Sequence, residues 1–385
     1  MRSKASVEKR ADEDVWGGGR RTSLRGASAV EDIPLTASRQ LDVDRFGGWA
    51  RNFAILAAGL VVFIHAGRPD MPGAVNWWSY RLLAWGVCEC AVPGFFLLSG
   101  FFLAGHFGEP GWWRCAVSGR IRTLLVPYLV WGFAYAVATL ALPAWTGLQS
   151  DSWPSGGDGW GDWLIQGLGL DPFRFPRLVP LWYVRCLFAL ILLSPILWRF
   201  ARRFGWWAPL PFILLNQVLL AMTDPMSGWP YIFFCGPLSL RGTAYFLAGV
   251  LLRRHGTPPG FRTCPPWRVT LPLAAGLVMS GHVLTHAGIQ GPAGCCQAVA
   301  VPVLLAASWR LLPSVRGPSW LVSAAFPVFL LHLFNLHAVK LVLPFDRSEW
   351  WGYPLRGVLV LVLSLGETWF IRLSPVLARF LFGGR

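Results

Sequence analysis

The stretch Phe53-Ala-Ile-Leu-Ala-Ala-Gly-Leu-Val-Val-Phe-Ile64, followed directly by His65, decides how this chain folds. No charged or polar side chain interrupts the run before the histidine. An ionisable side chain inside a membrane helix is costly, so it marks a functional candidate by default. Histidine also titrates near neutral pH, which suits proton transfer. The run therefore predicts a membrane helix that carries a candidate catalytic base.

The composition of the whole chain agrees with this prediction. The chain has 385 residues, of which 54% are hydrophobic and 14% charged, and its mean hydropathy is +0.48. Soluble domains average about 25% charged residues, so this chain has too little polar surface to coat a globule. Its 23 tryptophans favour the membrane–water interface. We expect an integral membrane protein whose first partner is the lipid bilayer.

Ten segments are long and apolar enough to be candidate membrane helices, since a span needs roughly 20 apolar residues. They are residues 50–68, 82–104, 123–143, 180–198, 206–222, 230–252, 269–287, 294–312, 319–343 and 354–376. We therefore predict an all-α polytopic protein of about ten transmembrane helices. Residues 1–50 are expected to be a disordered cytoplasmic tail, residues 51–376 the membrane domain, and residues 377–385 a short basic cytoplasmic tail.

The distribution of Lys and Arg orients these ten helices. With both termini cytoplasmic, 25 of the 34 basic residues fall on the inner side and 6 on the outer side, as the positive-inside rule requires. The rule also explains the net charge of +15, so no nucleic-acid partner is expected.

The cysteines and histidines give no sign of a metal site. The 8 cysteines lack zinc-finger spacing and are interpreted as buried thiols. His282 and His286 lie four residues apart, but no third ligand accompanies them. We expect no metal.

Five motifs occur in a characteristic order along the chain. They are VVFIH (61–65), VPGFFLLSGFFL (92–103), RIRTLLVPYLVW (120–131), PLWYV (180–184) and FPVFLLH (326–332). In this order they resemble the acyltransferase 3 family of membrane-bound O-acyltransferases. The resemblance implies transfer of an acyl group, often acetyl, from cytoplasmic acyl-CoA to a hydroxyl of a cell-envelope carbohydrate. It also implies a location in the bacterial inner membrane.

His65 matches the first-helix histidine of that family. A hydroxyl that attacks a thioester needs a base, and neutral imidazole serves as one; His65 would either deprotonate the acceptor or carry the acyl group briefly. The family often has a basic residue eleven positions earlier, where this chain has Ala54, with Arg51 one turn before it.

The basic pair Arg120 and Arg122 precedes Pro127 in the third motif. The resemblance implies contact with CoA phosphates, which arginine binds well through its planar fork of donors. The alternative is that both are positive-inside anchors. Thr123 stands at the usual second basic position.

Further site candidates lie within the predicted spans. Glu89 and Arg185 are intramembrane charges that would pair with each other or with Arg241, and Glu89 could instead orient His65. Trp182 and Tyr183 match an aromatic pair that either lines the acceptor or acyl channel or packs in the core.

Two more motif residues have expected roles. His332 matches a recurring late histidine, for which we weigh a site or channel role. Ser99 is not in a nucleophile elbow, so we expect it to line a cavity or pack, with Gly100 permitting close helix approach.

Two rivals to the acyltransferase hypothesis remain at this point. A transporter or flippase of polar or lipid-linked substrates would also need about ten helices and buried charges, but it does not account for the order of the motifs. The other rival is a family member that has lost activity and keeps a structural role, for which Ala54 and Thr123 argue.

Overall fold

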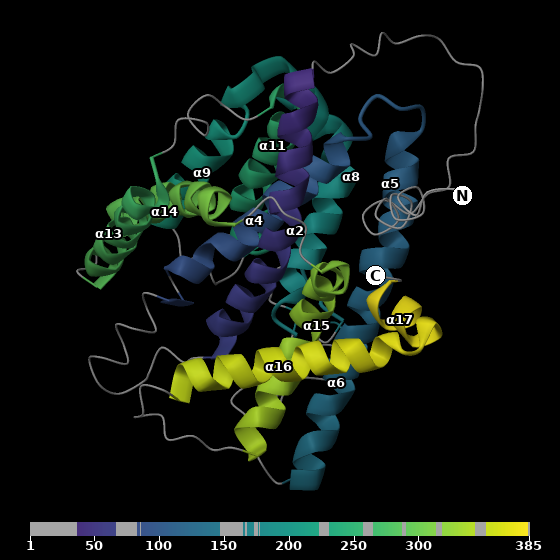
Figure 1. Ribbon diagram of the computed structural model, residues 1–385. Helices are drawn as coiled ribbons and strands as arrows, with labels where there is room; N and C mark the ends of the chain where they lie inside the picture. The colour runs from purple at the N-terminus through teal and green to yellow at the C-terminus, as the bar shows by residue number, and fades with distance from the viewer. Residues whose placement is uncertain are drawn as a thin grey trace, which may run out of the picture.

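The computed structural model describes residues 37–66, 83–84, 86–146, 165, 168–172, 176, 178–222, 231–256, 265–286, 290–312, 318–342 and 352–383. Every regular element within these ranges is helical. The elements are α2 (Ala37–Ala66), η1 (Val87–Cys90), α4 (Ala91–Ala104), α5 (Trp112–Arg120), η2 (Ile121–Leu125), α6 (Val126–Thr146), α8 (Leu181–Phe204), η3 (Gly205–Trp207), α9 (Leu210–Met222), α10 (Tyr231–Phe234), α11 (Leu240–His255), α13 (Trp267–His286), α14 (Gln290–Leu311), α15 (Ser319–Val342), α16 (Gly352–Arg372) and α17 (Pro375–Phe382). Figure 1 shows them as one bundle of long helices, with α13 and α14 packed together at one flank.

Seven helical stretches of the described chain are long and apolar enough to cross a membrane. They are Phe46–Ala66, Val87–Ala104, Trp112–Ala138, Leu181–Trp207, Gly294–Leu311, Ser319–Val342 and Gly352–Arg372. Each coincides with one of the predicted spans, so the protein is an all-helical membrane protein. The other three predicted spans correspond to the shorter apolar helix α9, to α10 with α11, and to α13. The count of ten crossings and the cytoplasmic termini stay predictions.

The start of α2 corrects the predicted disordered tail. The helix begins at Ala37, so residues 37–50 are helical. Aromatic packing explains why: the Phe46 ring lies 4.0 Å from that of Phe101, and the Trp49 ring lies 5.5 Å from that of Trp309. Both Phe46 and Trp49 are buried, which stabilises the early turns of the helix despite their polar sequence.

Most of the segment predicted as a short basic tail belongs to the helix α17. Ser374 caps α17 by accepting a hydrogen bond from the Leu377 N–H, and Phe382 is fully buried. Trp131 Nε1 donates to the Leu381 carbonyl at 2.8 Å, which ties the helix to α6. The cytoplasmic location of residues 377–385 stays a prediction.

Glycines bring α4 and α11 into close contact at the centre of the bundle. A Cβ on Gly100 would stand 2.0 Å from the Phe246 carbonyl oxygen, and one on Gly249 would stand 1.9 Å from the Leu97 carbonyl oxygen. Only a residue without a side chain lets the two backbones approach this closely, as small residues do at membrane helix interfaces. The expected packing role of Gly100 is confirmed.

We expect Gly249→Val to prevent correct folding. The added methyl groups would collide with the backbone of α4, which a rotamer change does not relieve, and overpacking of this kind is strongly destabilising. The readout is the yield of monodisperse protein in detergent and its Tm. Gly276→Val is the matched control, because a Cβ at Gly276 meets nothing within 4 Å and carries the same β-branched penalty. Equal yields of the two variants would contradict the packing argument.

The end of α2 that carries His65 is held by side chains of α16. Tyr353 Oη donates to the Phe63 carbonyl at 2.9 Å, and Arg356 donates to the Ala66 carbonyl at 3.1 Å. The last carbonyls of a helix lack partners within the helix, so these bonds satisfy groups that would otherwise be orphaned. Helix α16 crosses α2 and α15 in Figure 1, and it packs against both. The position of His65 is therefore fixed by a second helix.

Candidate active site

Two histidines from different helices meet inside the bundle. His65 lies near the end of α2 and His332 in the middle of α15, and their ring centroids are 5.2 Å apart with the planes inclined by 36°. His332 is fully buried, whereas His65 is partly buried. Residues from the first and last of the five motifs are therefore brought together, 267 positions apart in sequence.

The surroundings of His332 fix its tautomer. Its Nδ1 lies 2.8 Å from the Phe329 carbonyl oxygen, which can only accept, so Nδ1 carries the proton. In the neutral ring Nε2 is then an acceptor, and it is buried with no hydrogen-bond partner in the described part of the chain. A buried acceptor without a donor is unfavourable. The arrangement leaves a site into which a hydroxyl or an imidazole N–H can donate.

A mostly apolar cavity of about 90 Å³ lies further along the same helices. Its polar lining groups come from Ser99, Arg120, Tyr183 and Ser323. The apolar lining consists of Ala54, Phe95, Leu98, Phe102, Leu103, Leu124, Leu187, Ile191, Val322, Ala325, Phe326 and Phe329. Ala54 thus lies in the cavity wall, and no long basic side chain enters the cavity from that position.

Neither histidine lines the cavity. On α2, Ala54 precedes His65 by eleven residues, or about 16 Å of helical rise, and on α15 Phe329 precedes His332 by one turn. The cavity therefore lies towards the ends where α2 and α15 begin, and the histidines lie further along. The structure thus separates the cavity from the histidine pair along the axis of the bundle.

Three aromatic rings meet in the cavity wall, and one of them, Phe329, also contacts His332. The ring centroids of Phe95 and Tyr183 are 5.7 Å apart, those of Tyr183 and Phe329 5.7 Å, and those of Phe95 and Phe329 6.3 Å. We call Phe95, Tyr183 and Phe329 the aromatic triad. All three line the cavity, and the Phe329 carbonyl binds His332. Sequence reasoning missed Phe95 and Phe329, because aromatic residues are common throughout a membrane chain and only their convergence distinguishes these.

The two arginines of the third motif face different environments. Arg120 lines the cavity together with Tyr183, whereas Arg122 is exposed and does not line it. The π-helical turn η2 begins directly after Arg120. Such turns are often found at functional sites, and this one shifts the register between the two side chains. No ion pair to Arg120 occurs among the described residues, so its charge is available to an anionic or strongly polar ligand.

Two residues of the fourth motif and Arg185, which follows it directly, lie in three different settings. Tyr183 lines the cavity, where its Oη lies 3.3 Å from Ser99 Oγ, and the expected cavity-lining position of Ser99 is confirmed. Trp182 does not line the cavity and packs with its ring 6.3 Å from that of Phe96. Arg185 donates to the carbonyls of Gly169 and Asp171. In the structure Arg185 thus holds a loop, and its proposed contact with substrate stays a prediction.

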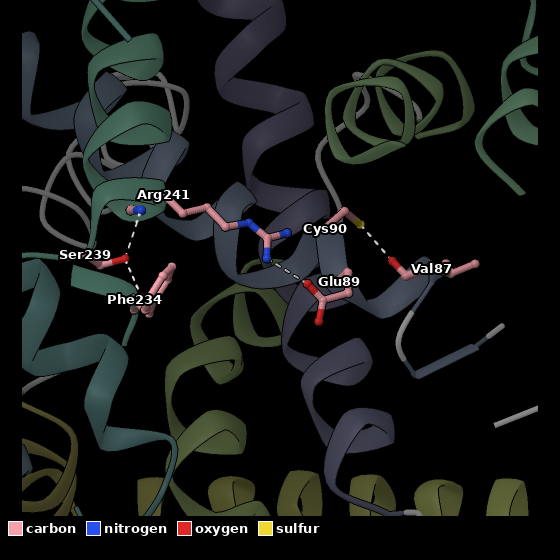
Figure 2. A network of polar contacts seen from close by, with 7 residues as sticks. Val87, Glu89, Cys90, Phe234, Ser239 and Arg241 are labelled. Atoms are coloured by element: carbon pink, nitrogen blue, oxygen red, sulfur yellow. Dashed lines mark hydrogen bonds and ion pairs between the residues drawn. The ribbon is translucent and has the colours of Figure 1, made fainter. Parts of the chain in front are cut away.

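Glu89 forms an ion pair with Arg241 rather than with Arg185. Arg241 NH1 lies 2.9 Å from Glu89 Oε2, and the two side chains are 35% and 26% exposed. Figure 2 shows Arg241 reaching from α11 across to Glu89 on η1. No hydrogen bond joins Glu89 to His65 within the described ranges. The contact favours a structural role for Glu89, in which it fixes the short helix that leads into α4.

Removing one partner of this pair should destabilise the protein more than removing both. Glu89→Gln or Arg241→Gln leaves one intramembrane charge without its counter-ion, which we expect to cost roughly 1–3 kcal/mol because both groups keep some access to their surroundings. The double variant should recover part of the loss, and a thermal double-mutant cycle in detergent measures it. If Glu89→Gln instead kept its Tm and lost activity, Glu89 would belong to the catalytic machinery, as the sequence hypothesis allowed.

Other donor groups do not gather into a metal site in the described residues. No three side chains of His, Cys, Asp or Glu are arranged there to hold a metal ion. The expectation that the protein uses no metal stays a prediction.

Comparison with known proteins gives one match. A family model described as an acyltransferase domain, that of the acyltransferase 3 family, matches residues 53–372. No curated protein and no solved structure matches the chain. The matched residues begin at the first residue of the run that ends in His65 and include the histidine pair, the aromatic triad and the cavity.

Proposed function

The chain belongs to the acyltransferase 3 family, and from this premise we propose that it moves an acyl group, with acetyl as the expected group, from cytoplasmic acyl-CoA to a hydroxyl of a cell-envelope carbohydrate. The family makes it a membrane acyltransferase in general; the donor, the acceptor and the bacterial inner membrane are our proposal. The observation that carries the proposal is the histidine pair, in which the buried Nε2 of His332 lacks a donor.

The cavity supports a role in binding the donor. Its apolar wall suits the neutral arm and the acyl group of a thioester, and Arg120 supplies positive charge. A guanidinium in an apolar cavity interacts more strongly with an anion or a carbonyl oxygen than it would in water. Arg120 would therefore hold the donor and orient it towards the aromatic triad.

The aromatic triad defines the path from the cavity to the histidines. With the N-terminus of α2 on the cytoplasmic side, the donor enters at the cavity and its acyl end must pass Phe95, Tyr183 and Phe329. Tyr183 and Ser99 offer hydroxyls along this path. The acceptor approaches from the opposite side of the membrane, where α2 ends at His65. The bundle thus gives the two substrates separate entrances.

The reaction needs a base that deprotonates the acceptor hydroxyl and a proton for the departing CoA sulfur. His65 takes the proton from the acceptor hydroxyl, whose oxygen attacks the thioester carbonyl carbon; the C–S bond breaks and the CoA sulfur leaves with a proton. His332, with Nδ1–H bonded to Phe329, presents Nε2 as an acceptor that positions His65 or the acceptor hydroxyl. An acyl group carried on His65 is the alternative sequence of steps.

The test is acyl transfer by purified protein in lipid nanodiscs. We expect release of CoA from radiolabelled acetyl-CoA, enhanced by envelope carbohydrate, and a release about 10²- to 10⁴-fold slower in His65→Ala. Mass spectrometry of envelope glycans from cells with and without the gene identifies the acyl group and its acceptor. A transporter or flippase would show no CoA release and would keep its transport in the His65→Ala variant, and that outcome would overturn the proposal.

A further inference from the structure

The helices α8 and α11 end side by side in a group of basic side chains. Arg202 and Arg203 lie in the last turn of α8, and Arg253, Arg254 and His255 lie in the last turn of α11. The two helices pack against each other. We call these five residues the α8–α11 basic cluster. By the predicted topology it lies on the cytoplasmic side.

Ring contacts fix how the two ends meet. The Arg254 guanidinium lies 5.2 Å from the centroid of the Trp198 ring, and the rings of Trp206 and His255 are 6.2 Å apart. Trp198 and Arg202 are four residues apart on α8 and so share a helix face. Trp198 thus has Arg254 over its ring and Arg202 one turn further along its own helix face, and like charges near one another repel. An anion bound between them would relieve that repulsion.

The positive-inside rule and the helix dipole explain single basic residues at inner helix ends. They do not account for the connection between this cluster and the cavity. The Arg253 guanidinium lies 5.3 Å from the centroid of the Phe101 ring, and the next two residues of α4, Phe102 and Leu103, line the cavity. Because consecutive residues of a helix face different directions, this contact places Arg253 at the level of the cavity's inner end but not in its wall.

The spacing suits a ligand with a charged head and a long neutral arm. On α8, Ile191 lines the cavity, and Arg202 lies eleven residues further, or about 16 Å along the helix. An extended pantetheine arm covers such a distance. Exposed tryptophans flank the cluster, since Trp206 and Trp207 are 42% and 73% exposed, and indole rings are good stacking partners for a purine.

We propose that the α8–α11 basic cluster binds the phosphates of the acyl-CoA nucleotide, with the pantetheine arm running past Phe102 and Leu103 into the cavity. This inference rests on the proposed function. Arginine and phosphate form short, charge-assisted hydrogen bonds, often in pairs. Arg202 and Arg203 are exposed, so they are free to close on a phosphate. Arg120 then serves the thioester end of the donor rather than its phosphates.

The experiment compares two probes on the purified full-length protein in nanodiscs of neutral lipid. CoA carries the 3′-phosphate and dephospho-CoA lacks it. We expect the wild type to prefer CoA by about tenfold, and Arg202→Gln/Arg203→Gln to weaken CoA binding at least about tenfold and to abolish the preference. Arg379→Gln is the matched control, because this exposed arginine lies on α17; it should bind CoA as the wild type does.

The outcomes separate this inference from the proposed function. If the wild type binds CoA and the double variant binds it equally well, the cluster is not the nucleotide site and the proposed function stands. If the double variant loses retention of added phosphatidylglycerol but keeps its CoA affinity, the cluster binds lipid and the inference fails. If the wild type binds neither probe and transfers no acetyl group, the proposed function itself fails. Transfer from acetyl-pantetheine, which lacks the nucleotide, should be equal in the wild type and the double variant.

Discussion

Replacing His65 with alanine is expected to lower acyl transfer by about 10²- to 10⁴-fold while the fold is kept. Removal of a positioned general base typically costs this much. His65→Gln keeps a polar side chain of similar length and should be equally inactive. Single-turnover release of CoA from acetyl-CoA, with Tm measured on the same samples, is the readout.

The control for this experiment is a second intramembrane histidine. His337 lies on α15 and its Nε2 is 3.0 Å from Tyr135 Oη, away from the cavity lining. His337→Gln should retain most of the transfer activity. Full activity of His65→Ala with an unchanged Tm would remove His65 from the mechanism and would favour a purely structural histidine pair.

The fold was predictable where apolar length alone decides it. Each of the seven helices that can cross a membrane overlaps a long, mostly apolar segment that predicted it. The prediction was weaker where packing decides. The segment 230–252 is mostly apolar, yet it breaks near Gly236 and Pro237, and Ser239 caps a new helix by accepting from the Gly242 N–H. Residues 37–50 are helical through the burial of Phe46 and Trp49, which a polar sequence conceals.

The candidate site was predictable in its members but not in its geometry. The motif order singled out His65 and His332, and the structure brings them together. The sequence could not reveal that Glu89 pairs with Arg241 or that Arg185 binds the loop at Gly169. The choice of partner among several intramembrane charges depends on how each helix is rotated about its axis. Helix rotation also distinguishes Arg120 from Arg122, which the sequence presents as equivalent.

That distinction leads to the second large effect. Arg120→Met should lower kcat/KM for the acyl donor by about 10- to 10²-fold, because it removes a charge-assisted contact that holds the donor in the cavity. Methionine keeps the apolar volume, so the cavity wall stays packed. Ala54 offers no charge, and no other arginine or lysine among the described residues lines the cavity. Donor-concentration series with acetyl-CoA and an unlabelled acceptor measure the change.

Comparison of three variants at Arg120 and Arg122 makes the test specific. Arg120→Lys keeps the charge but loses the planar fork, so it should fall between the wild type and Arg120→Met. Arg122→Met removes an exposed charge outside the cavity and should cost far less. Equal losses in Arg120→Met and Arg122→Met would mean that the two arginines act through the general positive charge of this membrane face. The cavity would then not be the donor site, and the separate entrances inferred for donor and acceptor would have to be abandoned.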